Sequence, residues 1–166
     1  MSTFQAGAYE GDLTAQYAQL AQQLQGLLTG EGRVMTLLSQ ASALLNQFLS
    51  DVNWVGFYLA EGETLYLGPF QGLPACSSID FRQGVCGAAA RTQMTQRVAD
   101  VHAFVGHIAC DVRSRAEVVV PIVVQGQIWG VLDVDSPSVN RFSAEDQLGL
   151  EHFVAVLQPF LAEAVQ

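Results

Sequence analysis

Apolar residues recur at helical spacing through the first fifty positions of the chain. Between residues 12 and 28 they return every three or four positions, and Gly30 and Gly32 then favour a stop. Residues 33–49 repeat this spacing with a broader apolar face. The pattern predicts two leading helices, at about 12–28 and 33–49.

The pattern then changes to the alternation and the residue types of β-strands. Residues 53–59 are aromatic and β-branched, and a short Gly-containing turn leads back into residues 64–70. A second pair of apolar runs, 116–124 and 127–134, is separated by Gln125-Gly126. These features predict two β-hairpins.

The segment between the two hairpins has little recognisable pattern. Residues 71–111 look mostly irregular, apart from a short helix expected over 84–92. Ser143 is a good N-cap for a final helix at about 143–163, which Pro159 is expected to kink or to end early. About forty irregular residues inside a compact domain usually serve a function, because their backbone needs another reason to be ordered.

This order of elements predicts an α/β (α+β) fold with one central antiparallel sheet flanked by helices. The length of 166 residues suits a single domain, 1–166, with its sheet and site segment at about 52–135. Half of the residues are hydrophobic and only 14% are charged, which allows a substantial core.

Charge and hydropathy argue against some classes of partner and location. The net charge of −9 argues against nucleic acid, whose phosphates would be repelled. The longest apolar runs, such as 118–124, have strand length and are too short to span a membrane. The N-terminus lacks the basic start and apolar stretch of a signal peptide, so a cytoplasmic location is expected.

The three cysteines, Cys76, Cys86 and Cys110, all fall in the irregular middle segment. Three cysteines in a cytosolic chain do not make a disulfide scaffold. Taken alone, they could be buried thiols that act as small hydrophobic side chains. Their clustering in the one segment that lacks regular structure favours a chemical role instead.

Three carboxylic acids lie just beyond this segment, on the second hairpin. Asp133 and Asp135 are two apart on one strand and therefore share a face, and Glu117 is on the preceding strand. Periodicity alone leaves two interpretations open. The acids form either a solvent-facing stripe or a recess that holds a cation or shares a proton.

Seven short segments can be compared with known families: Asn53–Tyr58, Leu67–Gly72, Pro74–Cys76, Gly84–Gly87, Val98–Phe104, Gly106–Asp111 and Gly130–Pro137. Together they resemble the free methionine-R-sulfoxide reductases. The resemblance covers about residues 53–153 and is most specific over 101–111, whereas the two leading helices match only in general character. The chain departs from the family pattern at Ala116, where Ser is common, and in the basic Arg113 and Arg115. These departures touch the edge of the expected site.

The resemblance implies a GAF domain, usually a homodimer, that reduces free methionine-R-sulfoxide. Cys110 would be the attacking thiolate. Cys76 is favoured as the thiol that resolves the sulfenic acid, with Cys86 as an alternative partner or relay. Such a cycle ends in a disulfide that thioredoxin or a similar dithiol must reduce, and it needs no metal or organic cofactor.

The resemblance also implies a substrate pocket. Glu117, Asp133 and Asp135 would bind the substrate, and crowded carboxyls can keep a proton near neutral pH for the departing sulfoxide oxygen. Trp54 and Tyr58 would form the wall at the methyl-sulfur end. The alternative for these two aromatics is hairpin core, since residues four apart on a strand share a face in either case.

Two histidines in the same segment admit a second kind of site. His102 and His107 could ligate a metal together with Cys110 and Asp111, but the chain has no CxxC and the spacing is atypical for zinc. Ordering of the loop by hydrogen bonds, or a bias of Cys110 toward the thiolate, is the favoured role. For the whole chain the alternative function is a non-catalytic GAF module that senses a small molecule.

Overall fold

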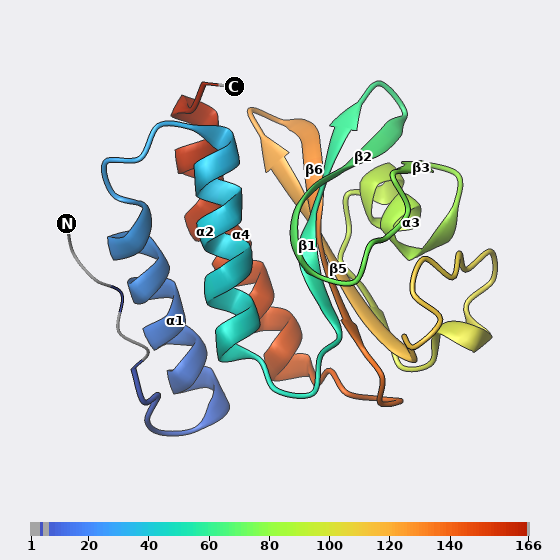
Figure 1. Ribbon diagram of the computed structural model, residues 1–166, viewed down its shortest axis with the longest axis horizontal. Helices are drawn as coiled ribbons and strands as arrows, with labels where there is room; N and C mark the ends of the chain where they lie inside the picture. Colours follow the sequence, from blue (N-terminus) through green and yellow to red (C-terminus); the bar gives the residue numbers. More distant parts are fainter. Residues whose placement is uncertain (1–3, 5–6, 166) are drawn as a thin grey trace.

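The structure, a computed structural model, describes Phe4 and residues 7–165 (Figure 1). Within these residues it has one six-stranded sheet in the order β3-β2-β1-β6-β5-β4, with all neighbours antiparallel. The elements in chain order are α1 (Leu13–Leu28), α2 (Val34–Phe48), β1 (Trp54–Glu61), β2 (Thr64–Gly72), β3 (Ser78–Asp80), α3 (Gly84–Thr92), β4 (Gln96–Val98), the 3-10 helix η1 (Val101–Ala103), β5 (Ala116–Val124), β6 (Gln127–Ser136) and α4 (Ala144–Glu163).

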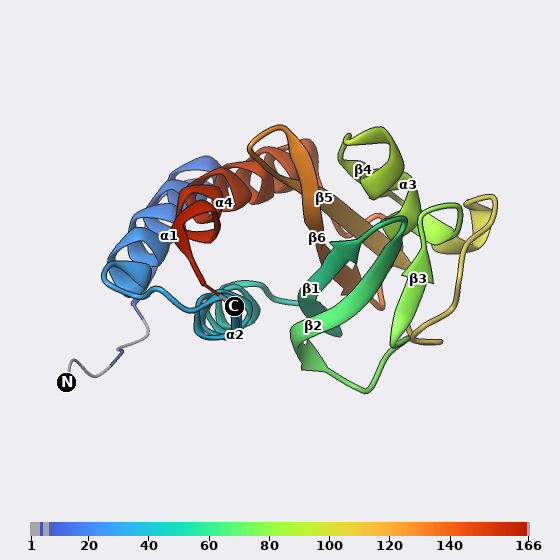
Figure 2. The same ribbon diagram turned by 90° about the horizontal axis from the view of Figure 1, so that it is seen from above.

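The helices divide unequally between the two faces of the sheet. Helices α2 and α4 pack directly on one face, with α1 against their outer side, and α3 packs on the other face (Figure 2). The three-helix side is pinned by polar contacts as well as by apolar packing. The Tyr17 hydroxyl on α1 donates a buried hydrogen bond of 2.7 Å to Asp146 in the first turn of α4. Ser143 and Asp146 form a reciprocal capping box at the start of α4.

Helix α4 continues through Pro159, so the expectation that this residue ends the regular helix is wrong. The helix extends to Glu163. A proline removes one hydrogen bond to the carbonyl four residues earlier, which here belongs to Ala155. Both Pro159 and Ala155 are exposed, so water can bond to the freed carbonyl.

The middle segment is more regular than its sequence pattern predicts. It contains β3 and β4, two strands of three residues each, and the short helix η1. Strand β3 pairs with β2, and β4 pairs with the start of β5. Three-residue strands are too short to show an alternation, because what defines them is a partner far away in the chain.

The alternation of side chains along β1 and β6 separates two cores. Val55 and Phe57 point toward the three-helix layer and join its large hydrophobic cluster. Trp54 and Tyr58 point the other way, into a smaller cluster with α3. The candidate functional site lies on this second face. No helix within residues 7–165 is long and apolar enough to cross a membrane.

Candidate active site

The strand register brings three acids together on the α3 face of the sheet. Glu117 on β5 lies opposite Asp135 on β6, and Asp133 is two residues before Asp135 on the same strand. The three side chains, called the acid triad below, are only 6–8% exposed. The interpretation as a solvent-facing stripe is therefore wrong, because α3 and the segments around it cover this face.

Burial sets the protonation state of the acid triad. Removal of water raises the pKa of each acid, since the charged form loses its hydration. Neighbouring carboxylates raise the pKa of Glu117 and Asp135 further, because like charges at close range cannot all ionise. One oxygen each of Asp133 and Asp135 is buried with no hydrogen-bond donor among the described residues. A proton held within the triad would supply a hydrogen-bond donor to one of these two oxygens.

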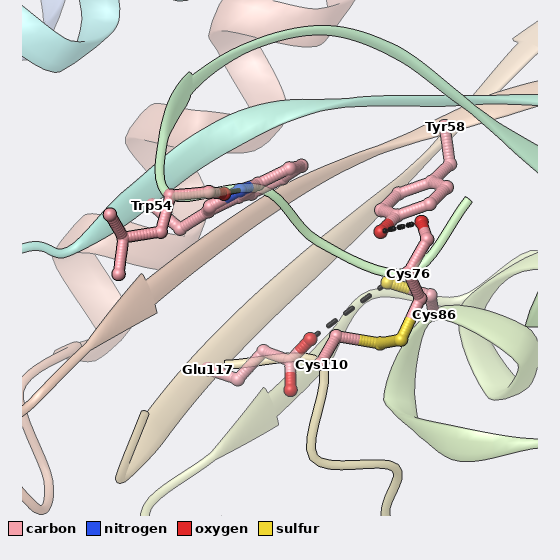
Figure 3. The surroundings of a disulfide bond; sticks show 7 residues. Trp54, Tyr58, Cys76, Cys86, Cys110 and Glu117 are labelled. Atoms are coloured by element: carbon pink, nitrogen blue, oxygen red, sulfur yellow. Dashed lines mark hydrogen bonds between the residues drawn. A yellow bond between two sulfur atoms is a disulfide. The ribbon is translucent and has the colours of Figure 1, made fainter. Parts of the chain in front are cut away.

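Cys86 lies on α3, next to Glu117 of the acid triad (Figure 3). Its Sγ is 3.8 Å from Oε1 of Glu117, within reach of a thiol hydrogen bond. The side chain is buried, and burial together with the nearby acids raises the pKa of the thiol well above its usual value. The raised pKa favours the neutral thiol, which can donate a hydrogen bond to Glu117.

The other two cysteines form a disulfide. Cys76, between β2 and β3, is bonded to Cys110, 34 residues later, with their Cα atoms 5.2 Å apart. Both residues are half-buried. The Tyr58 hydroxyl donates a 2.9 Å hydrogen bond to the carbonyl oxygen of Cys76, which ties the disulfide to β1 (Figure 3). The structure therefore places an oxidised cysteine pair at the rim of the acid triad.

Aromatic rings complete the pocket on the β1 side. Trp54 stacks on Phe70 with ring centroids 5.1 Å apart, and on Tyr58 at 5.8 Å. Both Trp54 and Tyr58 line the same cavity as the acid triad. Both residues thus belong to the hairpin core and line the cavity, and their role toward a substrate stays a prediction. The cavity volume is about 30 Å³.

A polar cluster orders the chain just after Cys110. The Asn53 amide donates to Asp111 at 3.0 Å and to the Ser114 hydroxyl at 3.2 Å. Arg113 forms a 2.8 Å ion pair with Asp111, and its hydrogen bonds lower the pKa of that carboxyl to about 2. Sequence reasoning did not assign this role to Asn53 or Ser114. The pairing of Asp111 with Arg113 two positions later is a local signal that could have indicated the turn.

Comparison with known proteins identifies the family of the chain. The GAF domain model matches residues 14–158. The free methionine-R-sulfoxide reductase of Escherichia coli is 50% identical over 146 residues, which cover 88% of each chain. The chain belongs to the free methionine-R-sulfoxide reductase family.

Solved structures of this family superpose closely on the chain. The fRMsr of Staphylococcus aureus in its reduced form gives a TM-score of 0.85 at 49% identity, covering 88% of this chain and 95% of that one. The free methionine-R-sulfoxide reductase from Neisseria meningitidis in complex with its substrate gives 0.90 at 36% identity, covering 98% of both chains. The predicted GAF fold, an α+β domain with a central antiparallel sheet, is confirmed.

The departures from the family pattern lie in different surroundings. Ala116 is buried and packs in the cluster on the three-helix side of the sheet, so it does not touch the site. The expectation that it borders the site is therefore wrong. Arg113 forms an ion pair with Asp111, and Nη2 of Arg115 lies 3.8 Å from Oδ2 of Asp100. The basic character of this loop is balanced locally.

The two histidines differ in exposure, and the role expected for them, ordering the loop or biasing Cys110 toward the thiolate, stays a prediction. The side chain of His102 is largely exposed, with Nδ1 3.9 Å from Asp100. His107 lines the cavity, and burial lowers its pKa, which favours the neutral imidazole. Cys110 is held in the disulfide, so it offers no thiolate for the His107-x-x-Cys110 metal site considered from the sequence.

A different group of side chains in this chain is closer to the geometry of a metal site than the histidines are. Ligand atoms of Cys86, Glu117 and Asp133 lie within 4.8 Å of one another. A metal binds thiolate and carboxylate, whereas burial here raises the pKa values of all three groups and favours their protonated forms. The arrangement is therefore better suited to holding a proton than to holding a metal ion.

Proposed function

We propose that this chain reduces free L-methionine-(R)-S-oxide to methionine with two of its cysteine thiols. The observation that carries the proposal is the Cys76–Cys110 disulfide beside a buried acid triad. Thiol-based reduction of a sulfoxide needs a nucleophilic thiol, a second thiol within bonding range and an acid that protonates the departing oxygen. The membership of the family supports the same assignment.

In the first step, the Cys110 thiolate attacks the sulfur of the sulfoxide, and the sulfoxide oxygen passes to the Cys110 sulfur. The acid triad delivers a proton to that oxygen, which gives methionine and a sulfenic acid on Cys110. The proton is available because burial raises the triad's pKa values. In the second step the Cys76 thiol condenses with the sulfenic acid, so that a disulfide and one water are formed. Two thiols are consumed for each sulfoxide reduced.

Cys76 is proposed as the resolving thiol in preference to Cys86. Cys76 is already bonded to Cys110, on segments that can bring the two Cα atoms to 5.2 Å. Cys86 is fixed on α3, buried against Glu117, and its raised pKa disfavours a nucleophilic thiolate. A positioning role suits it better, because its thiol can donate to a triad carboxylate.

Recognition of the free amino acid is proposed to rest on the acid triad and the aromatic wall. The triad carboxylates that remain ionised suit the substrate ammonium, which a peptide-bound methionine lacks. Trp54 and Tyr58 offer stacked aromatic surface for the methyl-sulfur end, where sulfur–aromatic contacts contribute roughly 0.3–1.5 kcal/mol. The same residues thus supply both selectivity and proton delivery.

The remaining parts of the cycle are proposals from chemistry. Thioredoxin or a similar dithiol protein would reduce the Cys76–Cys110 disulfide, and no metal or organic cofactor takes part in any step. We further propose a homodimer that works in the cytoplasm, where thiol reductants are kept reduced.

An assay with separated sulfoxide epimers tests the proposed reaction. With thioredoxin, its reductase and NADPH, the free R-sulfoxide should drive NADPH oxidation. The S epimer should fail, because oxygen and methyl exchange places. N-acetylation removes the ammonium and should lower kcat/KM by about thirty- to several-thousand-fold, since a lost partner of a buried charge costs ~2–5 kcal/mol.

Two outcomes of this assay would count against the proposal. Equal rates for free and N-acetylated R-sulfoxide would mean that the acid triad does not recognise the ammonium. Tight binding of the amino acid without any NADPH oxidation would favour the alternative of a non-catalytic GAF sensor.

A further inference from the structure

Two β-turns flank Cys110, and each places a valine at its tip. The His107 amide donates to the Phe104 carbonyl at 3.2 Å, which closes a turn with Val105 at its second position. The Ser114 amide donates to the Asp111 carbonyl at 3.1 Å, which closes a second turn with Val112 at the equivalent position. Turn tips of this kind usually carry proline or polar residues, so valine has no local reason to be there.

Both turn-tip valines are almost fully exposed. Val105 is 95% exposed and Val112 is 84% exposed, the two highest values among the exposed large apolar side chains of the described residues. Leu73, three residues before Cys76, adds a half-exposed apolar side chain on the other segment that the disulfide joins. Its backbone is fixed, because the Trp54 indole donates to its carbonyl oxygen. Three exposed apolar residues thus belong to the two segments that carry the disulfide.

The two segments that carry the disulfide have no net charge from their Asp, Glu, Lys and Arg residues, although the protein as a whole is acidic. Residues 71–78 carry no charged side chain, and residues 100–115 carry two arginines against two aspartates. The whole chain has a net charge of −9, so the acidic excess lies elsewhere. Residues 101–115 protrude at the end of the molecule opposite α1 (Figures 1 and 2). A macromolecule can therefore approach the disulfide without crossing the helical layer.

We propose that Leu73, Val105 and Val112 form the docking surface for the dithiol protein that reduces the Cys76–Cys110 disulfide. This inference rests on the proposed catalytic cycle, in which the disulfide must be reduced after every turnover. The partner is a protein with an active-site dithiol set in an uncharged apolar surface. Contact with the three apolar side chains buries surface on both proteins and holds the partner's thiolate at the half-buried sulfur atoms.

The exchange that this contact supports is balanced in atoms and electrons. The partner's thiolate attacks Cys76 Sγ, the Cys76–Cys110 bond breaks, and Cys110 leaves as a thiolate. The partner's second thiol then attacks the mixed disulfide and releases Cys76 as its thiolate, which takes up a proton. Two electrons pass to the enzyme and the partner becomes a disulfide. Attack at Cys76 directly regenerates the form of Cys110 that the first catalytic step requires.

The other occupants of this surface fit the observations less well. A small charged thiol gains little from exposed valine side chains, because it buries little apolar area. A second copy of this chain seated over the same residues would cover the disulfide and block its reduction. The position of the apolar side chains therefore favours a reductant of protein size.

The test measures reduction of the disulfide alone, with no sulfoxide present. Oxidised wild type, Val105→Asp, Val112→Asp and the double variant are mixed with reduced thioredoxin in a stopped-flow fluorimeter, and in parallel with dithiothreitol. Met35→Asp on α2 is the matched control, because Met35 is also well exposed, at 68%, and receives the same charge. The double variant should lower the second-order rate constant with thioredoxin by at least about tenfold, equivalent to ~1.4 kcal/mol. Rates with dithiothreitol, and both rates of the control, should stay within about twofold, since an isolated exposed substitution has little effect.

Each other result would overturn the proposal. An unchanged thioredoxin rate in the double variant would mean that the valines do not bind the reductant. An equal loss with dithiothreitol would mean that they act on the disulfide itself. An equal loss of the thioredoxin rate in Met35→Asp would mean that the added negative charge, and not its position, causes the effect. Because no sulfoxide is used, failure of the proposed enzymatic function would not affect this measurement.

Discussion

At the scale of single residues, the acid triad is the central feature of the candidate site. Three carboxyls on neighbouring strands are buried beside Cys86, and burial raises the pKa of every one of them. Such a cluster is unfavourable for folding at neutral pH, because ionisation of any member places charge in a poorly hydrated environment. Such a cluster suits the proposed site, which must both donate a proton to the sulfoxide oxygen and bind the ammonium of the substrate.

The linkage between these pKa values and stability gives a prediction for Glu117→Gln. A group whose pKa is raised above its ordinary value, 4.5 for Glu117, stabilises the fold below that pH and loses this stabilisation as pH rises toward the folded value. The free energy of unfolding of wild type should therefore fall relative to Glu117→Gln as pH increases from 4.5, by at most about 1.4 kcal/mol per pH unit. Urea unfolding at pH 5, 6.5 and 8 measures the difference.

The control for this experiment is Glu61→Gln, which removes an exposed carboxylate at the end of β1. Its difference from wild type should vary little with pH. A difference between wild type and Glu117→Gln that stays constant from pH 5 to pH 8 would contradict the raised pKa.

At the scale of elements, the site depends on how closely β1 and β2 approach each other. Gly56 lies between Trp54 and Tyr58 where the β1–β2 register shifts. An added Cβ there would be 2.3 Å from the Cβ of Phe70 and 2.9 Å from the ring of Trp54. The stacked Trp54 and Phe70 rings therefore require glycine at this position.

Gly56→Ala should accordingly destabilise the protein. Overpacking of this kind costs about 1–3 kcal/mol, and displacement of the Trp54 ring should also lower turnover. Gly26→Ala on the exposed side of α1 is the control, since nothing lies within 4 Å of its Cβ and alanine favours helix by up to ~1 kcal/mol. Urea denaturation of both variants checks the opposite signs. A stable Gly56→Ala would show that the two strands can separate at no cost.

The limits of sequence-based prediction are also visible at this scale. The ends of the long periodic elements were found to within two residues, because their pattern depends on one buried face. Strands β3 and β4 were missed since their short lengths carry no pattern. Periodicity showed that Asp133 and Asp135 share a face, but whether that face is solvent or pocket depends on α3, which packs there through contacts distant in sequence. The family resemblance, rather than the pattern, supplied the chemical roles.

At the scale of the whole molecule, the disulfide borders a small cavity. With Cys76 and Cys110 bonded, the cavity over the acid triad has a volume of about 30 Å³. That volume holds no more than a few water molecules, whereas a complete amino acid needs far more room. We therefore expect the oxidised enzyme to leave too little room for the amino acid at the acid triad.

The oxidised enzyme should consequently fail to bind the amino acid. Isothermal titration calorimetry with methionine-R-sulfoxide compares oxidised wild type with Cys110→Ser, which cannot form this disulfide. Cys110→Ser should bind the sulfoxide, and oxidised wild type should give no heat of binding at the same concentrations. Equal affinity in both proteins would show that disulfide formation leaves the pocket open.

The most direct test of the account is a single turnover without reductant. One equivalent of free methionine-R-sulfoxide is added to the reduced protein, and methionine, remaining thiols and disulfide-linked peptides are measured together. Wild type should form one methionine, lose two thiols and yield the Cys76–Cys110 peptide. Cys86→Ser should behave alike, Cys76→Ser should form methionine without this disulfide, and Cys110→Ser should form almost none, because a hydroxyl is a far weaker nucleophile than a thiolate. Near wild-type methionine formation by Cys110→Ser, with loss in Cys86→Ser, would contradict the account and assign the nucleophile to Cys86.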